Sequence, residues 1–156
     1  MPDVMTVKIS GLDQIDRKLR SMPLGVARRL LRQAMRSAAT IWRDEMQIRA
    51  PRGATEVRTK SGIIKKYPGF LAEHIRIQVG ANSDLEGYAK VGPARAAFWG
   101  MFLEFGTGPR HKKSGAYSGV MPAHPFIRAS YESKASAVLD KFVEEGRKIV
   151  AEEAIH

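Results

Sequence analysis

Apolar and cationic positions alternate through residues 24–50 with the period of an α-helix. The apolar residues recur at intervals of three and four, so a helix gathers them on one stripe. They are Ala27, Leu30, Leu31, Ala34, Ala38, Ile41 and Trp42. Four arginines fall within about 60° of one another on the same helix, nearly opposite that stripe. The pattern predicts a two-faced helix ended by Pro51, with an arginine ridge formed by Arg29, Arg32, Arg36 and Arg43.

The chain before this helix predicts two shorter elements. Residues 4–10 are rich in β-branched side chains and alternate crudely, which is typical of a strand. Residues 13–22 carry Ile15 and Leu19 one helical turn apart, and Pro23 follows. This segment therefore predicts a short helix that the proline ends.

The middle of the chain predicts loops, a hairpin and a short helix. Residues 52–69 combine glycine, proline and cationic side chains without periodicity, so they predict a long, mobile, basic loop. Residues 73–79 alternate and residues 88–91 resume an extended pattern after a turn-rich stretch, which predicts an antiparallel hairpin. Residues 94–105 predict a short helix, and residues 106–121 a second mobile basic loop.

The last quarter of the chain predicts a second amphipathic helix, which starts near Pro125 and runs almost to the C-terminus. Strands and helices are thus segregated rather than alternating, which favours the α+β class. We expect a single domain over residues 1–156, in which a small antiparallel β-sheet packs against the long N-terminal helix and the C-terminal helix.

Charge adds a bias that the hydrophobic pattern does not show. The 156 residues hold 26 Lys and Arg against 16 Asp and Glu, a formal net charge of +10. The first 60 residues carry +7 of this surplus, whereas residues 121–156 carry −1. Such a balance favours contact with polyanions or with an acidic partner. It also allows the two ends of neighbouring subunits to attract each other.

Several function classes find no support in the sequence. Cysteine is absent, which removes disulfides and thiolate chemistry. The four histidines lack metal-site spacing, and no phosphate loop, dinucleotide fingerprint or nucleophile elbow is present. No apolar run approaches the roughly 18 residues of a membrane span. We expect no enzyme activity, no cofactor, no metal, no small-molecule substrate and no membrane contact, in a protein made in a cytoplasm.

Glu104 is the one carboxylate in an unusual setting, because Phe102, Leu103 and Phe105 flank it. An apolar setting of this kind is also where a general acid can lie. No second catalytic group stands at a readable spacing, so a structural role is favoured. We expect Glu104 to accept hydrogen bonds from the turn at residues 106–108.

The aromatic residues around Glu104 predict two apolar contacts. Trp99, Phe102 and Phe105 stand at three-residue spacing and can bury one face in the core. Phe98 and Met101 lie on other faces and suggest a second contact, with another chain as one candidate.

Charged residues give two further sets of candidate contacts. The arginine ridge is either a solvated face or a contact for a protein or for nucleic-acid phosphates. The candidate DNA or partner contacts are Arg29, Arg32, Arg36, Arg43, Lys65, Lys66, Arg110, Lys112 and Lys113. The candidate acidic contacts between subunits are Glu144, Glu145, Glu152 and Glu153.

In the order and spacing of its motifs, the chain resembles the tail-completion, or head-to-tail joining, proteins of long-tailed bacteriophages. The resemblance rests on residues 9–13, on Ala50 and Pro51 after the long helix, on residues 102–107 and on residues 122–129. It departs from the family after Pro51, where a longer loop replaces the usual Thr-Gly-x-Leu segment. The motif residues taken as a structural anchor are Phe102, Glu104, Phe105, Gly106, Thr107, Pro125 and Phe126.

This resemblance implies a nonenzymatic structural protein at the virion neck, assembled in the host cytoplasm. Its partners would be the tail terminator and the head-closure or connector ring. It would itself form a ring homo-oligomer in the virion, with nonspecific contact to packaged DNA as a further candidate. Two alternatives stay open: a tail terminator or head-closure ring protein, and, in a different class, a basic nonspecific DNA-binding protein. A small hydrolase using Glu104 is disfavoured.

Overall fold

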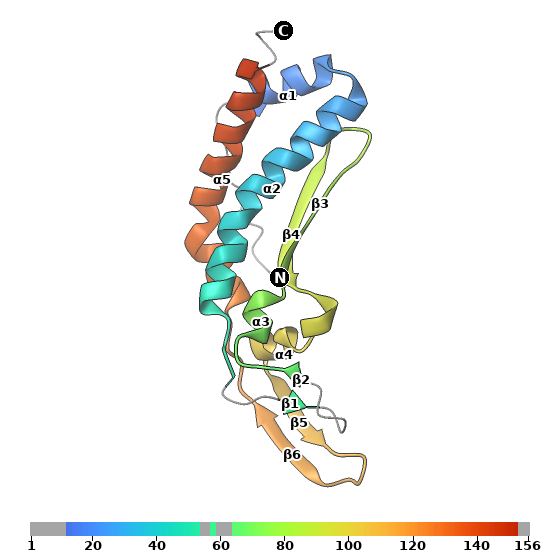
Figure 1. The fold of residues 1–156 in the computed structure, drawn as a ribbon, viewed down its shortest axis with the longest axis vertical. Coiled ribbons are helices and arrows are strands. Elements are labelled where there is room, and N and C mark those ends of the chain that lie inside the picture. The colour runs from blue at the N-terminus through green and yellow to red at the C-terminus, as the bar shows by residue number, and fades with distance from the viewer. Residues whose placement is uncertain (1–11, 54–56, 59–63, 153–156) are drawn as a thin grey trace.

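A computed structural model describes residues 12–53, 57–58 and 64–152 of the chain. Two helices of 26 residues each run side by side as its body: α2 (Leu24–Arg49) and α5 (Ile127–Glu152). The hairpin of β3 (Ile75–Ala81) and β4 (Gly87–Pro93) lies along α2 as a second layer (Figure 1). The predicted α+β class, with a small antiparallel sheet against two long helices, is confirmed.

Helix α2 buries the stripe that its sequence pattern predicts. Its buried residues are mostly small or flexible: Ala27, Leu31, Ala34, Met35, Ala38, Ala39 and Met46. Alanines let α5 and the hairpin approach the helix axis closely, and methionine fills irregular gaps. The helix ends at Arg49, just before Ala50 and the predicted stop at Pro51.

The β3–β4 hairpin pairs in register from Ile75 opposite Pro93 to Ala81 opposite Gly87. At the turn, Asn82 Oδ1 accepts hydrogen bonds from the backbone N–H of Asp84 and of Glu86, at 3.0 and 2.9 Å. Such a side-chain acceptor organises a short turn without help from distant residues. The predicted hairpin is confirmed, with its first strand shifted two residues toward the turn and its second strand longer than the alternation indicated.

Tyr131 of α5 connects strand β4 to the two long helices. Its hydroxyl donates to the Val91 carbonyl at 3.0 Å and accepts from the Val91 N–H at 3.2 Å. Its ring meets the Trp42 ring of α2 edge to face, with centroids 4.5 Å apart. One side chain therefore joins both helices and the hairpin.

One end of the body is closed by α1 (Leu12–Ser21), the predicted short helix. Its buried residues Ile15 and Leu19 join a cluster with Ala27 and Leu31 of α2. Gly146 of α5 lies against Ile15 so closely that a Cβ there would stand 2.4 Å from the Ile15 Cδ1. The predicted strand at residues 4–10 lies outside the described residues.

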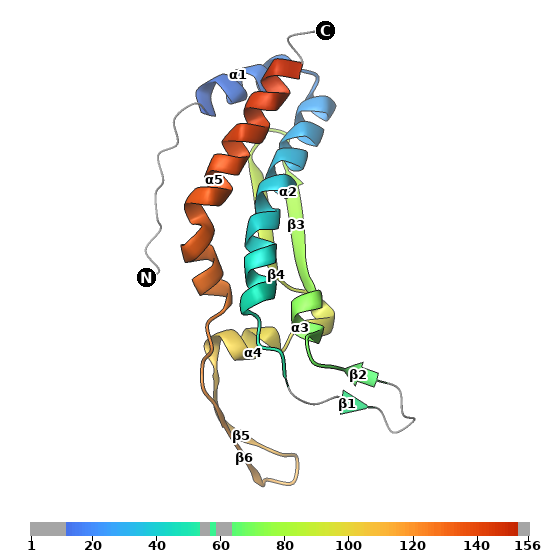
Figure 2. The same ribbon diagram turned by 60° about the vertical axis from the view of Figure 1, so that its left-hand side comes forward.

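Short elements make up the opposite end of the molecule (Figure 2). Here lie α3 (Phe70–Glu73), a 3₁₀ turn (Arg95–Ala97) and α4 (Gly100–Phe105). The short pair β1 (Val57–Arg58) and β2 (Ile64–Lys66) falls within the region predicted as a loop at 52–69, of which 54–56 and 59–63 are outside the description. A second core cluster under these elements includes Met46, Leu71, Ile75 and Phe126.

Residues 106–121, predicted as a second mobile basic loop, contain two paired strands, so the loop prediction is wrong there. Strands β5 (Thr107–His111) and β6 (Tyr117–Met121) form an antiparallel hairpin there, which extends away from the helical body (Figures 1 and 2). Its turn is closed by hydrogen bonds between the backbones of Lys112, Gly115 and Ala116, and Gly115 has φ +80°. Only glycine adopts that conformation without strain, so this turn chemistry organises the hairpin.

Candidate assembly surface at the α4–α5 junction

Glu104 of α4 closes the N-terminus of the long helix α5. Its Oε2 accepts hydrogen bonds from the backbone N–H of Phe126 at 2.8 Å and of Ile127 at 2.7 Å, and its Oε1 accepts from that of Arg128 at 2.9 Å. The first N–H groups of a helix have no partner within the helix, and its dipole favours an anion at that end. A residue 22 to 24 positions earlier in the chain thus supplies the cap.

These partners differ from the predicted ones. Glu104 was expected to hold the turn at residues 106–108, but its oxygens contact the start of α5 instead. The reason is geometric: the chain after Gly106 leaves as strand β5 and returns through β6, so α5 starts next to α4. With 5% of its surface exposed and three donors on its two oxygens, Glu104 is committed to this contact.

Backbone contacts on both sides of Glu104 tighten the junction. The His124 N–H donates to the Leu103 carbonyl at 2.6 Å, and the Met121 N–H donates to Thr107 Oγ1 at 3.2 Å. Gly106 has φ +71°, and a Cβ on it would lie 2.8 Å from both the Ala123 nitrogen and the Met121 oxygen. Glycine is therefore required here on grounds of both conformation and space.

Phe126 and Pro125 lie in different environments. Phe126 is among the most deeply buried large side chains of the described chain, whereas Pro125 is exposed. Ser130, which is also buried, donates its hydroxyl to the Phe126 carbonyl at 2.6 Å. Two contacts therefore fix the segment before α5: the burial of Phe126 in the core and the hydrogen bonds that Glu104 of α4 accepts.

The outer face of the α4 region is apolar. Four large side chains are exposed there by 60, 43, 47 and 66%, respectively: Phe98, Met101, Phe102 and Phe105. Their spacing is i, i+3, i+4 and i+7, the spacing of a single helix face. Phe98 and Phe102 meet edge to face with ring centroids 6.0 Å apart. We call these four residues the apolar stripe.

The expected burial of this region is partly wrong. Phe102 and Phe105 were assigned to a core face with Trp99, yet both point outward. Only Trp99 packs against the core, where its ring lies 5.4 Å from that of Phe70, and the Lys66 ammonium lies 3.6 Å above it. Phe98 and Met101, for which a second apolar contact was predicted, are both exposed, and that contact stays a prediction.

The predicted cationic contacts divide into separate places. Arg29, Arg32 and Arg36 are exposed along α2, and Arg43 pairs with Asp44 at 2.7 Å. Arg110, Lys112 and Lys113 are exposed on the β5–β6 hairpin. Lys66 is engaged by Trp99, and the Lys65 side chain lies outside the described residues.

The predicted acidic contacts on α5 are partly occupied within their own helix. Glu144 and Glu145 form a ladder with Lys141 and Lys148, with nitrogen to oxygen distances of 2.6 to 3.2 Å. Hydrogen bonds from Lys148 and Lys141 lower the pKa of the Glu144 carboxyl. Glu152 is exposed, and Glu153 is not among the described residues.

Sequence reasoning missed two features of this surface. Arg76 of β3 lines the same hollow as Arg36 and Arg43, and the alternation of residues 73–79 was a readable signal for its exposure. The i, i+3, i+4, i+7 spacing of the apolar stripe was also present in the sequence, but nothing in that spacing tells which way the stripe faces.

Over residues 12–53, 57–58 and 64–152, no group of three or more potential ligands could hold a metal ion, and no helix could cross a membrane. Comparison with known proteins gives no match to a protein-family model, to a curated protein or to a solved structure.

Proposed function

We propose that the protein is a structural subunit of the neck of a long-tailed phage, where it completes the tail and joins it to the DNA-filled head. The phage context comes from the motif resemblance at residues 102–107 and 122–129. The observation that carries an assembly role is the apolar stripe, which faces outward on a helix that Glu104 fixes to the body.

An outward apolar stripe supports this role because exposed aromatic side chains gain free energy when a partner removes them from water. A fully buried phenylalanine contributes about 1.5–3 kcal/mol, and contiguous patches of this kind mark interaction surfaces. Aromatic anchors dominate the energy of most interfaces. The stripe therefore supplies a candidate contact between neighbouring subunits or with the next ring of the neck.

The state of Glu104 supports a holding role over a chemical one. A general acid must present its proton to a substrate. Both oxygens of Glu104 instead accept hydrogen bonds from backbone N–H groups, in a place shielded from water. We propose no catalytic role for it.

Assembly can be tested by sizing the purified protein and by cryo-EM of virions that carry it. We expect ring-sized assemblies or neck density from the natural chain. Phe98→Ser combined with Phe105→Ser should remain monomeric while keeping the fold. The matched control is Leu24→Ser combined with Ile48→Ser, which removes two exposed apolar side chains from α2 and should assemble normally.

Absence of the chain from the neck and tail of the virion would overturn the proposal, as would normal assembly by the stripe variant. The alternatives respond differently. A terminator or head-closure ring protein would give density at a neighbouring level of the same axis. A basic DNA-binding protein would stay monomeric at all concentrations and bind DNA tightly, with strong salt dependence.

A further inference from the structure

The arginine ridge forms one wall of a groove between α2 and β3. Two hollows, of about 380 and 310 Å³, follow each other along this boundary, and Arg36 lines both. Arg29 and Arg32 line the first, whereas Arg43 and Arg76 line the second. Five arginines from two elements therefore line two adjoining hollows that share Arg36, and we call these two hollows together the arginine groove.

Most of this charge lacks a partner within the described chain. No described carboxylate forms an ion pair with Arg29, Arg32 or Arg36, while Arg43 contacts its neighbour Asp44. Arg76 donates to the carbonyls of Glu73 and Ile75, so its charge is also uncompensated by a carboxylate. Like charges three and four residues apart destabilise a helix slightly. A bound anion would remove that cost.

A second copy of this chain is a poor source of the anion. The acidic residues at the end of α5 were the candidates, but Glu144 and Glu145 are neutralised by Lys141 and Lys148 on the same helix. The ligand that fits is therefore an external polyanion.

The shape and lining of the groove favour a duplex backbone. Arg29 and Arg43 are 14 positions apart, which is about 21 Å along a helix axis. Double-stranded DNA carries one charge per about 1.7 Å, so several phosphates fall within reach of the five arginines. The remaining lining residues are amides, a hydroxyl and aliphatic side chains: Gln33, Thr40, Gln47, Ile75, Ile77 and Val79. None is aromatic, whereas single-strand sites stack bases on aromatic rings.

We propose that the arginine groove binds the phosphate backbone of double-stranded DNA without reading its sequence. Arginine suits this task because its planar fork bonds phosphate oxygens in pairs. Binding at the groove stands independently of the neck assignment, because it needs only the α2–β3 boundary and leaves the apolar stripe free.

The test is a fluorescence-anisotropy titration of a mixed-sequence duplex of about 20 base pairs, over a salt series from about 50 to 200 mM. Arg32→Gln combined with Arg36→Gln should weaken binding at least tenfold. It should also reduce the slope of log K against log salt by about 2, since each lost phosphate contact lowers it by about 1. Both residues are exposed, so the urea midpoint should stay unchanged, and Arg29→Gln with Arg32→Gln serves as a second variant.

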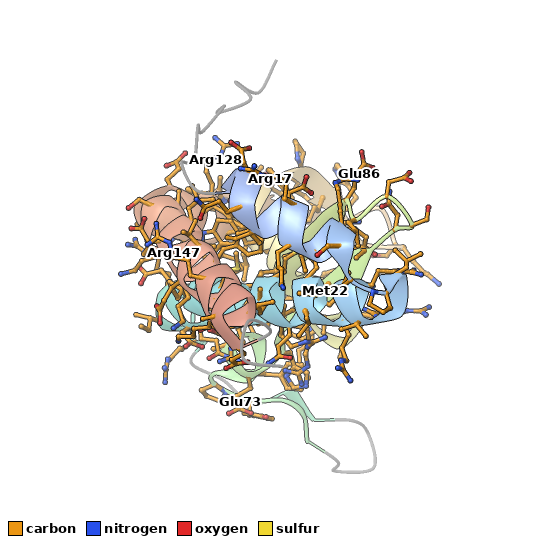
Figure 3. All side chains as sticks on the ribbon, turned by 90° about the horizontal axis from the view of Figure 1, so that it is seen from above. Arg17, Met22, Glu73, Glu86, Arg128 and Arg147 are labelled. Carbon is orange, nitrogen blue, oxygen red and sulfur yellow. The ribbon has the colours of Figure 1, made fainter. Side chains whose placement is uncertain are left out.

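Two control variants each remove two positive charges outside the arginine groove. Arg17→Gln with Arg147→Gln changes α1 and α5; Figure 3 shows Arg147 on the opposite side of the molecule from Glu86, which adjoins β4. Arg95→Gln with Arg128→Gln changes two exposed side chains, on the 3₁₀ turn and at the start of α5. Both should keep the slope within about 1 of the natural protein's.

The proposal is overturned if the natural protein fails to bind the duplex at about 50 mM salt. It is also overturned if either control loses as much affinity as the groove variants. Competition by poly-glutamate equal to that of DNA at matched charge would assign the groove to an acidic protein instead. Failure to form rings while groove-dependent DNA binding persists would sink the neck assignment alone.

Discussion

Helices α2 and α4 carry the same kind of periodic pattern but bury opposite kinds of residue. Helix α2 turns alanine, leucine and methionine inward and arginine outward. In the α4 region, phenylalanine and methionine point outward, while the single carboxylate, Glu104, is buried. One helix follows the ordinary rule of hydrophobic burial, and the other reverses it.

The difference shows that the needs of a neighbouring element can outweigh hydrophobic burial. The start of α5 presents N–H groups that are fully or partly shielded from water, and a shielded group left unpaired costs about 1–3 kcal/mol. Glu104 satisfies three of them. Turning α4 over to hide the apolar stripe would remove this cap. The buried residues of α2 are all apolar and cap no other helix, so hydrophobic burial sets the orientation of α2.

The largest effect is expected for Glu104→Leu, which fills the site but leaves three N–H groups without acceptors. We expect a loss of about 4 kcal/mol in the free energy of unfolding. Glu104→Gln keeps one oxygen acceptor and should lose about half as much. Urea denaturation followed by circular dichroism measures both. A loss below about 1 kcal/mol for the leucine variant would mean that α5 needs no cap and that the comparison is mistaken.

The next largest difference between α2 and α4 is expected in the stability lost when one apolar side chain of each helix is truncated. Leu31→Ala on α2, where the side chain is 7% exposed, should cost about 3 kcal/mol. Phe102→Ala on α4 removes a larger side chain but should cost less than about 1 kcal/mol, because that ring already faces water. Equal losses in urea denaturation would show that the apolar stripe is part of the core after all.

Gly106→Ala should cost about 2 kcal/mol, because it combines a glycine-only conformation with a clash against the Ala123 and Met121 backbones. Gly108→Ala is the matched control. Gly108 has nothing within 4 Å of its added Cβ and should change stability little. A thermal melt of the two variants checks this, and similar melting temperatures would contradict the tight junction between α4 and the segment before α5.

The smallest effect concerns the body, where Tyr131 joins α2, α5 and β4. Burial raises the pKa of the Tyr131 phenol in the folded state. The contribution of this shift to the free energy of unfolding is therefore fully present below the unfolded pKa of about 10. It is lost as the pH rises through the pKa of the folded state.

The natural protein should thus lose stability above about pH 10 more steeply than Tyr131→Phe does, by under 1 kcal/mol. Tyr117→Phe, at an exposed position of β6, should keep the natural alkaline loss. Urea midpoints between neutral and alkaline pH measure the difference. Identical pH profiles for the natural protein and Tyr131→Phe would contradict the claim that the Tyr131 hydroxyl stabilises the contact between α5 and β4.

The elements that the sequence predicts well are those organised by local signals. The α2 stripe, the proline stops and the Asn82 turn all act over a few residues. The β5–β6 hairpin escaped prediction because Gly108 and Pro109 disfavour a strand, and Pro109 cannot donate to a ladder. Irregular register and the φ of +89° at Gly119 let the pairing tolerate them.

The candidate surface was predictable in its residues but not in its orientation. Glu104 stands out in the sequence as a lone carboxylate among aromatic side chains. Its partners lie 22 to 24 positions away, and no pattern near residue 104 points to Phe126, Ile127 or Arg128. Arg76 and the ridge likewise belong to separate elements and meet only when β3 packs on α2.

By itself the sequence determined the two long helices, the β3–β4 hairpin, the arginine ridge and the unusual apolar setting of Glu104. Helical and strand periodicities are properties of a few consecutive residues, so they can be read without the fold. Only the tertiary structure decided that Glu104 faces the start of α5 and that the apolar stripe faces outward. Both faces of α4 contain residues that can be buried, and the choice between them depended on the unpaired N–H groups of a distant helix.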